Sequence, residues 1–349
     1  MPDAAHRTPY RLGLAVTDAE REAVYAFRYA HYYSHLVDAP GVDHRAKRVY
    51  SPHDDFSDHH AGYAQDGTLV IVGTGTRAST ENLPPEWEAL LRLQRLSPLG
   101  LQNILIYSRL VEHSAIHGSP LFAEFFRYTA RYFTERGYAY SIHYCAPALV
   151  PIYERMGYRT YGGGYTLSSG LYRIPMILLP SNTARLGSIL APFTHALHGI
   201  TTSDDVARAI TIFPELATTP LCAMRADACV NHVRGIFAKS SGNVSLAASI
   251  PDAAGKILRK ATLFPLAKGD SPIHSNDAPL LWLPLESSCE TTNAKGEKTV
   301  VTPGTFINGH ACKTLTAMEA GRVLFFSPKN ISLEAEAAIL HHSLWSRLI

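Results

Sequence analysis

The chain of 349 residues is longer than one ordinary domain and suits two. Hydrophobic residues make up 46%, charged residues 18%, and the formal net charge is +2, which gives no electrostatic argument for nucleic acid or an anionic membrane. Because no apolar run is long enough to span a bilayer and the start MPDAAHRTPY lacks the apolar core of a signal peptide, we expect a cytoplasmic protein without a membrane span.

The cysteines and histidines give no metal or disulfide signature. The cysteines are scattered without a C-x-x-C pair, which indicates neither a zinc knuckle nor a disulfide framework. A metal site built from His31, His35 and the acidic, histidine-rich residues 53–60 is an alternative. No recognised ligand spacing supports it, so we expect no metal.

The N-terminal residues predict a strand from Leu12 to Val16 followed by a helix. Thr17 to Glu20 forms a capping box, S/T-x-x-E, that opens this helix. Arg28 lies beside the apolar stripe of the helix. It is either a solvated charge or a side chain directed into a cleft.

A hairpin and a second helix are expected next. Residues 38–60 have no clean period and are dense in charge and histidine. Strands at Ala61 to Ala64 and Thr68 to Ala78 flank Asp66-Gly67, a dipeptide typical of a tight turn. Residues 83–96 predict an amphipathic helix.

The stretch from residue 103 to residue 165 predicts strand, loop, helix, strand, helix and strand. The first strand covers Ile104 to Leu110. The main helix begins at Pro120 and is stopped by Gly137, and the next strand covers Tyr140 to Cys145. The result is a βαβ unit with a second helix attached.

The loop from Ser114 to Pro120 consists largely of small residues and leads into a helix N-terminus. Backbone N–H groups at such a position suit a phosphate or a pyrophosphate. The alternative is an ordinary connection between strand and helix.

The segment from Pro147 to Tyr158 places Tyr153 on a short helix that ends at Gly157 and runs into a strand. It resembles the "lYer.GF" ending of the GNAT acyltransferase superfamily. The resemblance implies that Tyr153 is the general acid that protonates the leaving thiolate of the acyl donor. The alternative for Tyr153 is a packed core tyrosine.

Further motifs, in the same order along about half of the chain, resemble acyl-homoserine-lactone synthases and long-chain N-acyl amino acid synthases. This GNAT branch usually accepts acyl groups from acyl carrier protein. The matching residues are Phe27-Arg28-Tyr29 for F-R-Y/F, Asp55-Phe56-Ser57-Asp58 for D-x-Y/F-D with the aromatic one place earlier, Gly73 or Gly75 with Arg77 for G-x-x-R, and Ile106-Tyr107-Ser108-Arg109 for E-x-S-R.

Ile106 stands where that family has the glutamate that serves as the candidate base. Either the base has moved or the reaction differs. The replacement candidates on or beside the two central strands are Glu112, His113, His143 and Tyr144. We place His143 first because an imidazole has a pKa near the working pH.

The resemblance also implies the binding residues. The thioester oxygen would meet the strand from Ser108 to Leu110. Arginine pairs bidentately with carboxylates, so Arg28, Arg77 and Arg109 would bind the acceptor's carboxylate or order the acidic loop, unless they only form structural ion pairs. The expected substrate-binding set is Arg28, Asp55, Asp58, Arg77, Tyr107 and Arg109.

The donor loop differs from that of CoA-binding relatives because it lacks the full R/Q-x-x-G-x-G/A pattern. Fewer backbone donors for a pyrophosphate favour the phosphopantetheine arm of an acyl carrier protein over acyl-CoA. No permanently bound cofactor is expected. The residues assigned to the donor are Leu110, Ile116, His117, Gly118 and Ser119.

The second half of the chain has a different predicted secondary structure. After a strand from Leu171 to Leu179, helix starts at residues 203–205 and 225–227 predict a helical bridge. From residue 257, short strands separated by Gly and Pro turns predict an antiparallel roll, and residues 333–348 predict a final helix. The expected strands are 261–266, 280–285, 289–293, 299–301, 305–307, 314–317 and 322–326.

The order of the roll resembles the β-roll of cyclic-nucleotide-binding domains. Where that family has Gly-Glu and a phosphate-binding Arg, this chain has Asn308-Gly309-His310-Ala311-Cys312-Lys313. The ribose-binding glutamate is therefore missing. A degenerate scaffold or a dimerisation module is favoured over a phosphate site at Lys313, and a homodimer is left open.

The expected fold class is α/β (α+β), a GNAT fold with a mixed twisted sheet flanked by helices over residues 1–182, then a helical bridge over 183–256 and an antiparallel β-roll over 257–349. The expected function is transfer of an acyl group from acyl carrier protein or acyl-CoA to the amine of an amino-acid-like acceptor. One alternative is a catalytically silent acyl-thioester sensor that signals through the roll. Another is an acyl-thioester enzyme with a non-amine acceptor.

Overall fold

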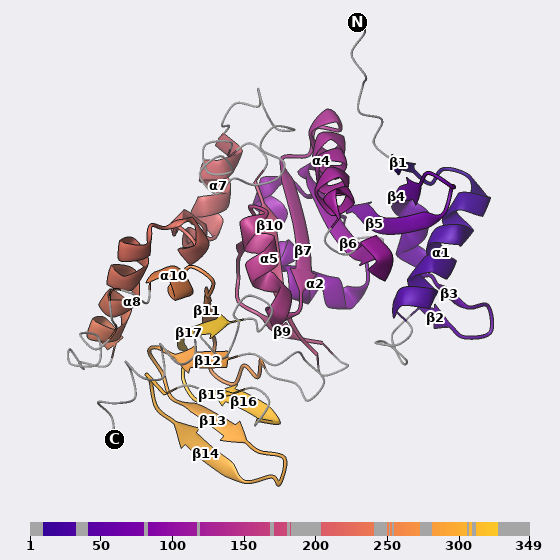
Figure 1. Ribbon diagram of the computed structural model, residues 1–349. Helices are drawn as coiled ribbons and strands as arrows, with labels where there is room; N and C mark the ends of the chain where they lie inside the picture. Colours follow the sequence, from indigo (N-terminus) through magenta and orange to yellow (C-terminus); the bar gives the residue numbers. More distant parts are fainter. Residues whose placement is uncertain are drawn as a thin grey trace, which may run out of the picture. The chain divides into compact units, whose positions relative to one another are not determined.

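The chain divides into two compact units in a computed structural model (Figure 1). The first unit comprises residues 1–143, 178–186 and 192–208, and the second comprises residues 144–177, 187–191 and 209–349. The structure describes residues 10–32, 41–79, 83–116, 119–167, 171–179, 182, 204–240, 250, 252, 255–272, 281–305, 307–308 and 312–326.

The first unit alternates strands and helices, as the sequence predicts. Its elements are β1 (Tyr10–Leu14), α1 (Asp18–Tyr32), β2 (Val42–Asp43), β3 (Arg48–Val49), a 3₁₀ helix (Pro52–Phe56), β4 (Ser57–Ala64), β5 (Leu69–Arg77), α2 (Pro85–Leu91), α3 (Leu93–Leu96), β6 (Ile104–Glu112) and α4 (Pro120–Glu135). The chain passes into the second unit within β7 (Tyr140–Cys145).

The sheet of the first unit is mixed and runs in the order β1-β4-β5-β6-β7. Neighbouring strands are antiparallel except β6 and β7, which pair in parallel through the α4 crossover. Helix α1 packs Val24 and Tyr25 against Val72 and Val111 on one face. Helix α4 covers the other face, where the rings of Phe133 and Tyr107 lie 5.8 Å apart. The predicted α/β class is therefore confirmed.

The helix starts follow the local sequence signals. The Glu20 amide donates to Thr17 Oγ1 at 3.2 Å, and the Glu20 carboxylate accepts from the Thr17 amide at 3.0 Å, which is the predicted capping box. At the end of α4, Gly137 has φ +75°, a left-handed conformation that glycine adopts without a steric penalty.

The strand predicted from Leu12 to Val16 is found two residues earlier, and two other predicted elements differ more from the structure. Strand β4 begins at Ser57, so residues 57–60 belong to the sheet rather than to an irregular loop. The single helix expected over residues 83–96 is split into α2 and α3, because Arg92 adopts a left-handed backbone with φ +54°. No glycine or proline stands at Ser57 or at Arg92 that would mark either change in the sequence.

The second unit begins with a small helix and a short antiparallel set of strands and continues into two more sheets. Strands β8 and β9 pair with β10, and the later sheets run β11-β17-β12-β15 and β14-β13-β16. The elements are α5 (Val150–Arg155), β8 (Arg159–Thr160), β9 (Tyr165–Thr166), β10 (Tyr172–Leu178), α7 (Asp204–Ile212), α8 (Ala226–Ser240), α10 (Gly255–Leu258), β11 (Thr262–Leu266), β12 (Leu281–Pro284), β13 (Cys289–Thr292), β14 (Lys298–Val301), β15 (Ile307–Asn308), β16 (Thr314–Ala317) and β17 (Gly321–Phe326).

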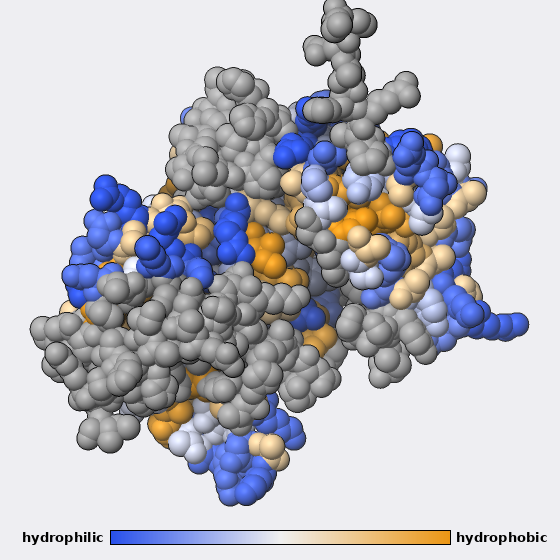
Figure 2. All heavy atoms as spheres, viewed as in Figure 1, coloured by the Kyte–Doolittle hydropathy of each residue, from blue (hydrophilic) through white to orange (hydrophobic). Residues whose placement is uncertain are grey.

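A shared core joins helix α8 to the strands that follow it. Val233 and Phe237 of α8 pack in one buried cluster with Leu283, Leu285 and Phe326. The β13–β14 hairpin has mainly hydrophilic side chains on its outer surface (Figure 2), including Lys298, which donates to Glu290 at 2.8 Å. Burial alternates along β13, where Cys289 and Thr291 are buried, whereas β14 is largely exposed.

The predicted C-terminal strands are present, except that the strand expected over 305–307 is found at Ile307–Asn308, and α7 and α8 begin within the predicted start sites. The final helix expected over residues 333–348 lies outside the described residues. The domain boundaries at residues 182 and 256 and the kinship of the roll to cyclic-nucleotide-binding domains stay predictions. Within the described ranges, no helix has the length and apolar character needed to cross a membrane.

Candidate functional site: a buried carboxylate at a bulged central strand

A buried carboxylate, Asp54, lies between two arginines in the first unit. Arg28 and Asp54 have fully buried side chains, and Arg28 Nη1 donates to Asp54 Oδ1 at 2.9 Å. Arg109 Nη1 donates to Asp54 Oδ2. Burial opposes ionisation of Asp54, but the two guanidinium charges outweigh it and lower the pKa of this carboxyl. Asp54 is therefore a fixed negative charge.

The local sequence positions Asp54 through a second capping box. Ser51 precedes the 3₁₀ helix Pro52–Phe56, and its amide donates to Asp54 Oδ2 at 2.8 Å. Proline at the first helical position and an acidic residue two places later suit such a start. Arg109 Nη2 also donates to Ser51 Oγ, so the same guanidinium holds both ends of the box.

A neutral histidine completes the cluster on the other side of Arg28. Arg28 Nη2 contacts His59 Nδ1 at 3.1 Å, and Tyr25 Oη lies 3.3 Å from His59 Nε2. Burial, helped by the Arg28 charge, lowers the pKa of His59 to about 4, so the ring is neutral at pH 7. Since Nδ1 must accept from arginine, the proton is on Nε2, which donates to Tyr25. Arg28 Nη2 also donates to Thr74 Oγ1.

The cluster holds a bulge in the central strand β6. The pairing of β5 with β6 shifts from Thr74 opposite Ser108 to Val72 opposite Val111, so that Arg109 and Leu110 face a single residue, Gly73. Arg109 has φ +51°, a left-handed backbone that is rare outside glycine. The bulge interrupts the regular ladder and redirects the Arg109 side chain onto Asp54.

Ser108 lies immediately before the bulge. Its Oγ is buried and has no hydrogen-bond partner within the described part of the chain. A buried hydroxyl without a partner costs free energy, so its presence is a reason to expect a ligand there.

The structure brings together Arg28 and Arg109 from the predicted binding set, and both contact Asp54 rather than Asp55 or Asp58. Asp55 is exposed and accepts from Tyr50 Oη at 2.7 Å. Asp58 accepts from Tyr132 Oη. Arg28 and Arg109 therefore hold the acidic loop through Asp54, and the substrate-binding roles of Asp55 and Asp58 stay predictions.

The sequence did contain a signal for Asp54. The match of residues 55–58 to D-x-Y/F-D moved the aromatic residue by one place. Keeping Phe56 in the aromatic position selects Asp54, and Ser51-x-x-Asp54 independently marks a capping box. Thr74 and His59 had no comparable signal, because only the register of β4 and β5 turns them toward Arg28.

The other predicted binding residues of the first unit lie around this sheet. Arg77 is exposed at the end of β5, opposite Leu105 of β6. Tyr107 is buried, and its Oη lies so close to Gly73 that a Cβ there has no room. Leu110 of the bulge is half-buried.

The predicted donor loop is only partly described. Ile116 is buried, and its carbonyl accepts from the Ser119 amide at 3.0 Å. Ser119 caps α4 without a side-chain bond to the helix. His117 and Gly118 lie outside the described residues.

The positions considered for the base differ in their burial and chemistry. Ile106 is fully buried, so no acid-base group occupies that position. Burial lowers the pKa of His143 to about 3, and such an imidazole is a weak proton acceptor. Burial therefore argues against His143, and its role as the base stays a prediction. Glu112 is half-buried at the end of β6, opposite Ile71.

Tyr153 belongs to the second unit, on helix α5. It is half-buried and its ring lies edge-on to Tyr158, with centroids 5.7 Å apart. Within the described residues, no group of three or more His, Cys, Asp or Glu side chains could hold a metal ion.

Comparisons with known proteins give structural neighbours only. No protein-family model matches the chain, and no curated protein matches it. Three matching solved structures are the acyl-homoserine-lactone synthase LasI (14% identity, 55% of this chain and 96% of that one, TM-score 0.40), the CoA-dependent acyl-homoserine-lactone synthase BjaI (12%, 58% and 98%, 0.40), and the N-acyl amino acid synthase FeeM from uncultured soil microbes (12%, 50% and 93%, 0.38).

Proposed function

We propose that the chain is an acyltransferase that moves an acyl group, of fatty type, from a thioester donor to the amine of an amino-acid-like acceptor. The observation that carries the proposal is the bulge at Arg109, held by a buried carboxylate in the middle of the sheet. Strained backbone that surrounding contacts hold in place is concentrated at functional sites.

The bulge supports the chemistry of thioester aminolysis. The attack of an amine on a thioester carbonyl builds negative charge on oxygen, which preorganised N–H or O–H donors stabilise. An interrupted ladder frees backbone N–H groups from strand pairing, and the buried Ser108 Oγ offers a further donor. In this proposal Ser108 and the bulge contact the thioester, whereas Arg28, Asp54 and Arg109 position them.

The proposed reaction replaces a thioester bond by an amide bond. The amine nitrogen forms a bond to the carbonyl carbon, the carbon–sulfur bond breaks, and the sulfur leaves as a thiolate that takes one proton. The motif resemblance assigns this proton to the Tyr153 hydroxyl. The amine loses one proton to a base, for which Glu112 is the best remaining candidate because its carboxylate lies at the end of β6.

The donor and the acceptor follow from the sequence pattern rather than from the geometry. The incomplete phosphate-binding pattern at His117 to Ser119 favours acyl carrier protein as donor, with acyl-CoA as the second choice. Exposed Arg77 is the proposed contact for the acceptor's carboxylate, since Arg28 and Arg109 are committed to Asp54.

Thiol release tests the proposal. The purified protein is given acyl-CoA and acyl carrier protein donors, with and without pooled amino acids, and compared with Tyr153→Phe and Ser108→Ala. The proposal expects amine-dependent release that falls in both variants. Release that is independent of amines indicates hydrolysis, and equal rates with both donors contradict the preference for the carrier protein.

One alternative has a structural observation in its favour. Ile106 is fully buried in place of the family's glutamate, and His143 is a weak base. A silent acyl-thioester sensor needs neither group. Tight donor binding without turnover for any acceptor would establish that function instead.

A further inference from the structure

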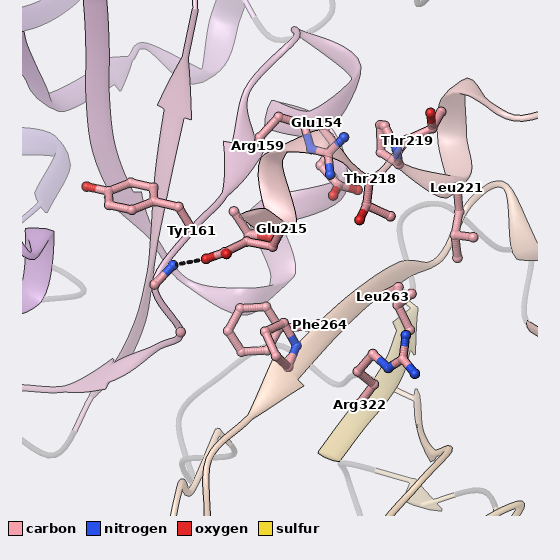
Figure 3. A pocket seen from close by; sticks show the side chains of 15 residues that line it. Glu154, Arg159, Tyr161, Glu215, Thr218, Thr219, Leu221, Leu263, Phe264 and Arg322 are labelled. Atoms are coloured by element: carbon pink, nitrogen blue, oxygen red, sulfur yellow. Dashed lines mark hydrogen bonds between the residues drawn. The ribbon is translucent and has the colours of Figure 1, made fainter. Parts of the chain in front are cut away.

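The second unit contains a cavity that the proposed transfer reaction does not use. It has a volume of about 190 Å³ and is bordered by the strand that begins with Arg159, by the segment around Glu215 to Leu221, and by β11 (Figure 3). These lining segments are far apart in the sequence but belong to one compact unit. The cavity therefore exists only in the folded second unit.

A buried arginine that forms no ion pair with any described residue borders this cavity. Arg159 is only 7% exposed, and its Nε and Nη1 have no hydrogen-bond partner in the described part of the chain. Arg159 and Glu154 both line the cavity (Figure 3), and the charges of these two side chains interact. No carboxylate oxygen among the described residues lies within 4.0 Å of an Arg159 nitrogen, which is the distance limit for an ion pair.

The other charged groups of the lining are already engaged. Arg322 donates from Nε to Glu286 at 2.7 Å, and Glu215 Oε1 accepts from the Gly162 amide at 2.7 Å. Glu154 is buried and accepts from Thr262 Oγ1 at 3.1 Å. Among the described charged groups of the lining, Arg159 is the one for which no hydrogen bond or ion pair to another described residue is found.

Glu154 compensates this charge only in part. Burial raises the pKa of Glu154 to about 7, against the opposing charge of Arg159 and the Thr262 hydrogen bond. About half of the Glu154 carboxyls are thus neutral near pH 7. A buried guanidinium with a partly neutral neighbour has a strong electrostatic preference for a second anion.

The other residues that line the cavity determine which chemical groups suit the rest of the ligand. Leu221, Leu263 and Phe264 provide an apolar wall, and Thr218 and Thr219 provide hydroxyl groups. We propose that this cavity binds a small organic monocarboxylate with an apolar side chain, whose carboxylate pairs with Arg159 and whose apolar part lies against Phe264 and Leu263. This proposal rests on the residues of the second unit alone and does not depend on the proposed acyl transfer.

The test uses the full chain and thermal unfolding with isovalerate, benzoate and leucine as carboxylate probes, and chloride and inorganic phosphate as other anions. We expect a saturable rise in the melting temperature with at least one carboxylate probe. Arg159→Met should abolish this rise. Arg155→Met is the matched control, because it removes the same charge from an exposed neighbouring position outside the cavity lining, and it should retain the rise.

Arg159→Met removes two buried N–H donors that have no partner among the described residues, but it also removes the charge that interacts with Glu154, so the melting temperature of its ligand-free form is measured first. Should it fail to fold, Glu154→Gln replaces it, since the amide can still accept from Thr262. That variant should bind the carboxylate with an affinity that no longer falls when the pH rises from 6 to 8, whereas the wild-type affinity falls. The groups facing Glu154 that could also contribute are Arg155, Arg159, Cys222 and Cys145.

Three outcomes would overturn the proposal. One is the absence of any saturable shift with the carboxylates. Another is an equal shift in wild type and Arg159→Met. The third is a shift with phosphate alone, which would exclude the carboxylate class. Thiol release is a separate measurement, so its failure and the failure of carboxylate binding can be told apart.

Discussion

Arg109 donates to the buried carboxylate of Asp54 while its own backbone is held at φ +51°. A left-handed backbone costs a non-glycine residue about 1–3 kcal/mol, so it persists only where other contacts stabilise it. The ion pair to Asp54 and the bond to Ser51 Oγ are those contacts. The shape of the central strand and the acidic turn before β4 are therefore one structural unit.

Asp54→Asn should destabilise the protein strongly. The substitution leaves fully buried Arg28 without its counter-charge, and breaking a buried ion pair typically costs about 3–5 kcal/mol. The adjacent Asp55→Asn is the matched control, because Asp55 is exposed and its loss should cost at most about 1 kcal/mol. Urea unfolding measures both. Equal losses would show that Asp54 does not hold the cluster.

Ser108→Ala should separate activity from stability. Removing a buried hydroxyl without a partner should leave the free energy of unfolding unchanged or raise it by up to about 1 kcal/mol. Transfer should slow by about 10²-fold if the hydroxyl stabilises the developing oxyanion. Ser97→Ala, which removes a hydroxyl bonded to the Gln94 carbonyl, is a control that should leave the rate unchanged. An unaltered rate in Ser108→Ala would remove Ser108 from the reaction.

Gly73→Ala should disturb the bulge by steric overlap. A Cβ at this position meets the Tyr107 side chain, and overpacking of this kind costs about 1–3 kcal/mol. Gly13→Ala is the control, since nothing lies within 4 Å of a Cβ there. Adding Tyr107→Phe removes the nearest atom and should recover part of the loss in thermal unfolding. No recovery would mean that the overlap is relieved elsewhere.

Stability should fall on acidification below about pH 6.5. Burial lowers the pKa of both His60 and His143 to about 3 from an ordinary 6.5. The unfolded chain therefore binds these protons first, so each histidine contributes stability above pH 6.5 that is lost as the pH falls toward 3. The loss is up to about 1.4 kcal/mol per pH unit for each ring.

The variant His60→Gln tests this origin of the pH dependence. It removes one titrating ring, so the slope of unfolding free energy against pH between 6 and 4 should decrease relative to wild type. Denaturant unfolding at several pH values gives the slope directly. An unchanged slope would assign the acid sensitivity to other groups.

The succession of strands and helices along the chain and most element boundaries were predictable because local signals specify them. Gly67 and Gly296 adopt φ +86° and +83° at turns that the sequence marks with Asp-Gly and Lys-Gly. Thr17 and Glu20 form the predicted capping box. Such features depend on neighbouring residues, so the sequence contains the information needed to find them.

The cluster and the cavity were not predictable in the same way. Arg92 and Arg109 take left-handed backbones for which their side chains give no signal, since tertiary contacts decide them. Arg159 lines a cavity with Thr218 and Phe264, residues that only folding brings together. Likewise, desolvation of His143 lowers its pKa, and the depth of burial cannot be read from one residue in a strand.

Detection of the product tests the central claim most directly. The protein is incubated with an acyl thioester of acyl carrier protein and ¹⁵N-labelled amino acids, and the small molecules are analysed by mass spectrometry. The proposed function predicts an N-acyl amino acid that carries the label, needs the protein, and decreases with Ser108→Ala. Release of the free fatty acid alone, or donor binding without any product, would contradict acyl transfer to an amine.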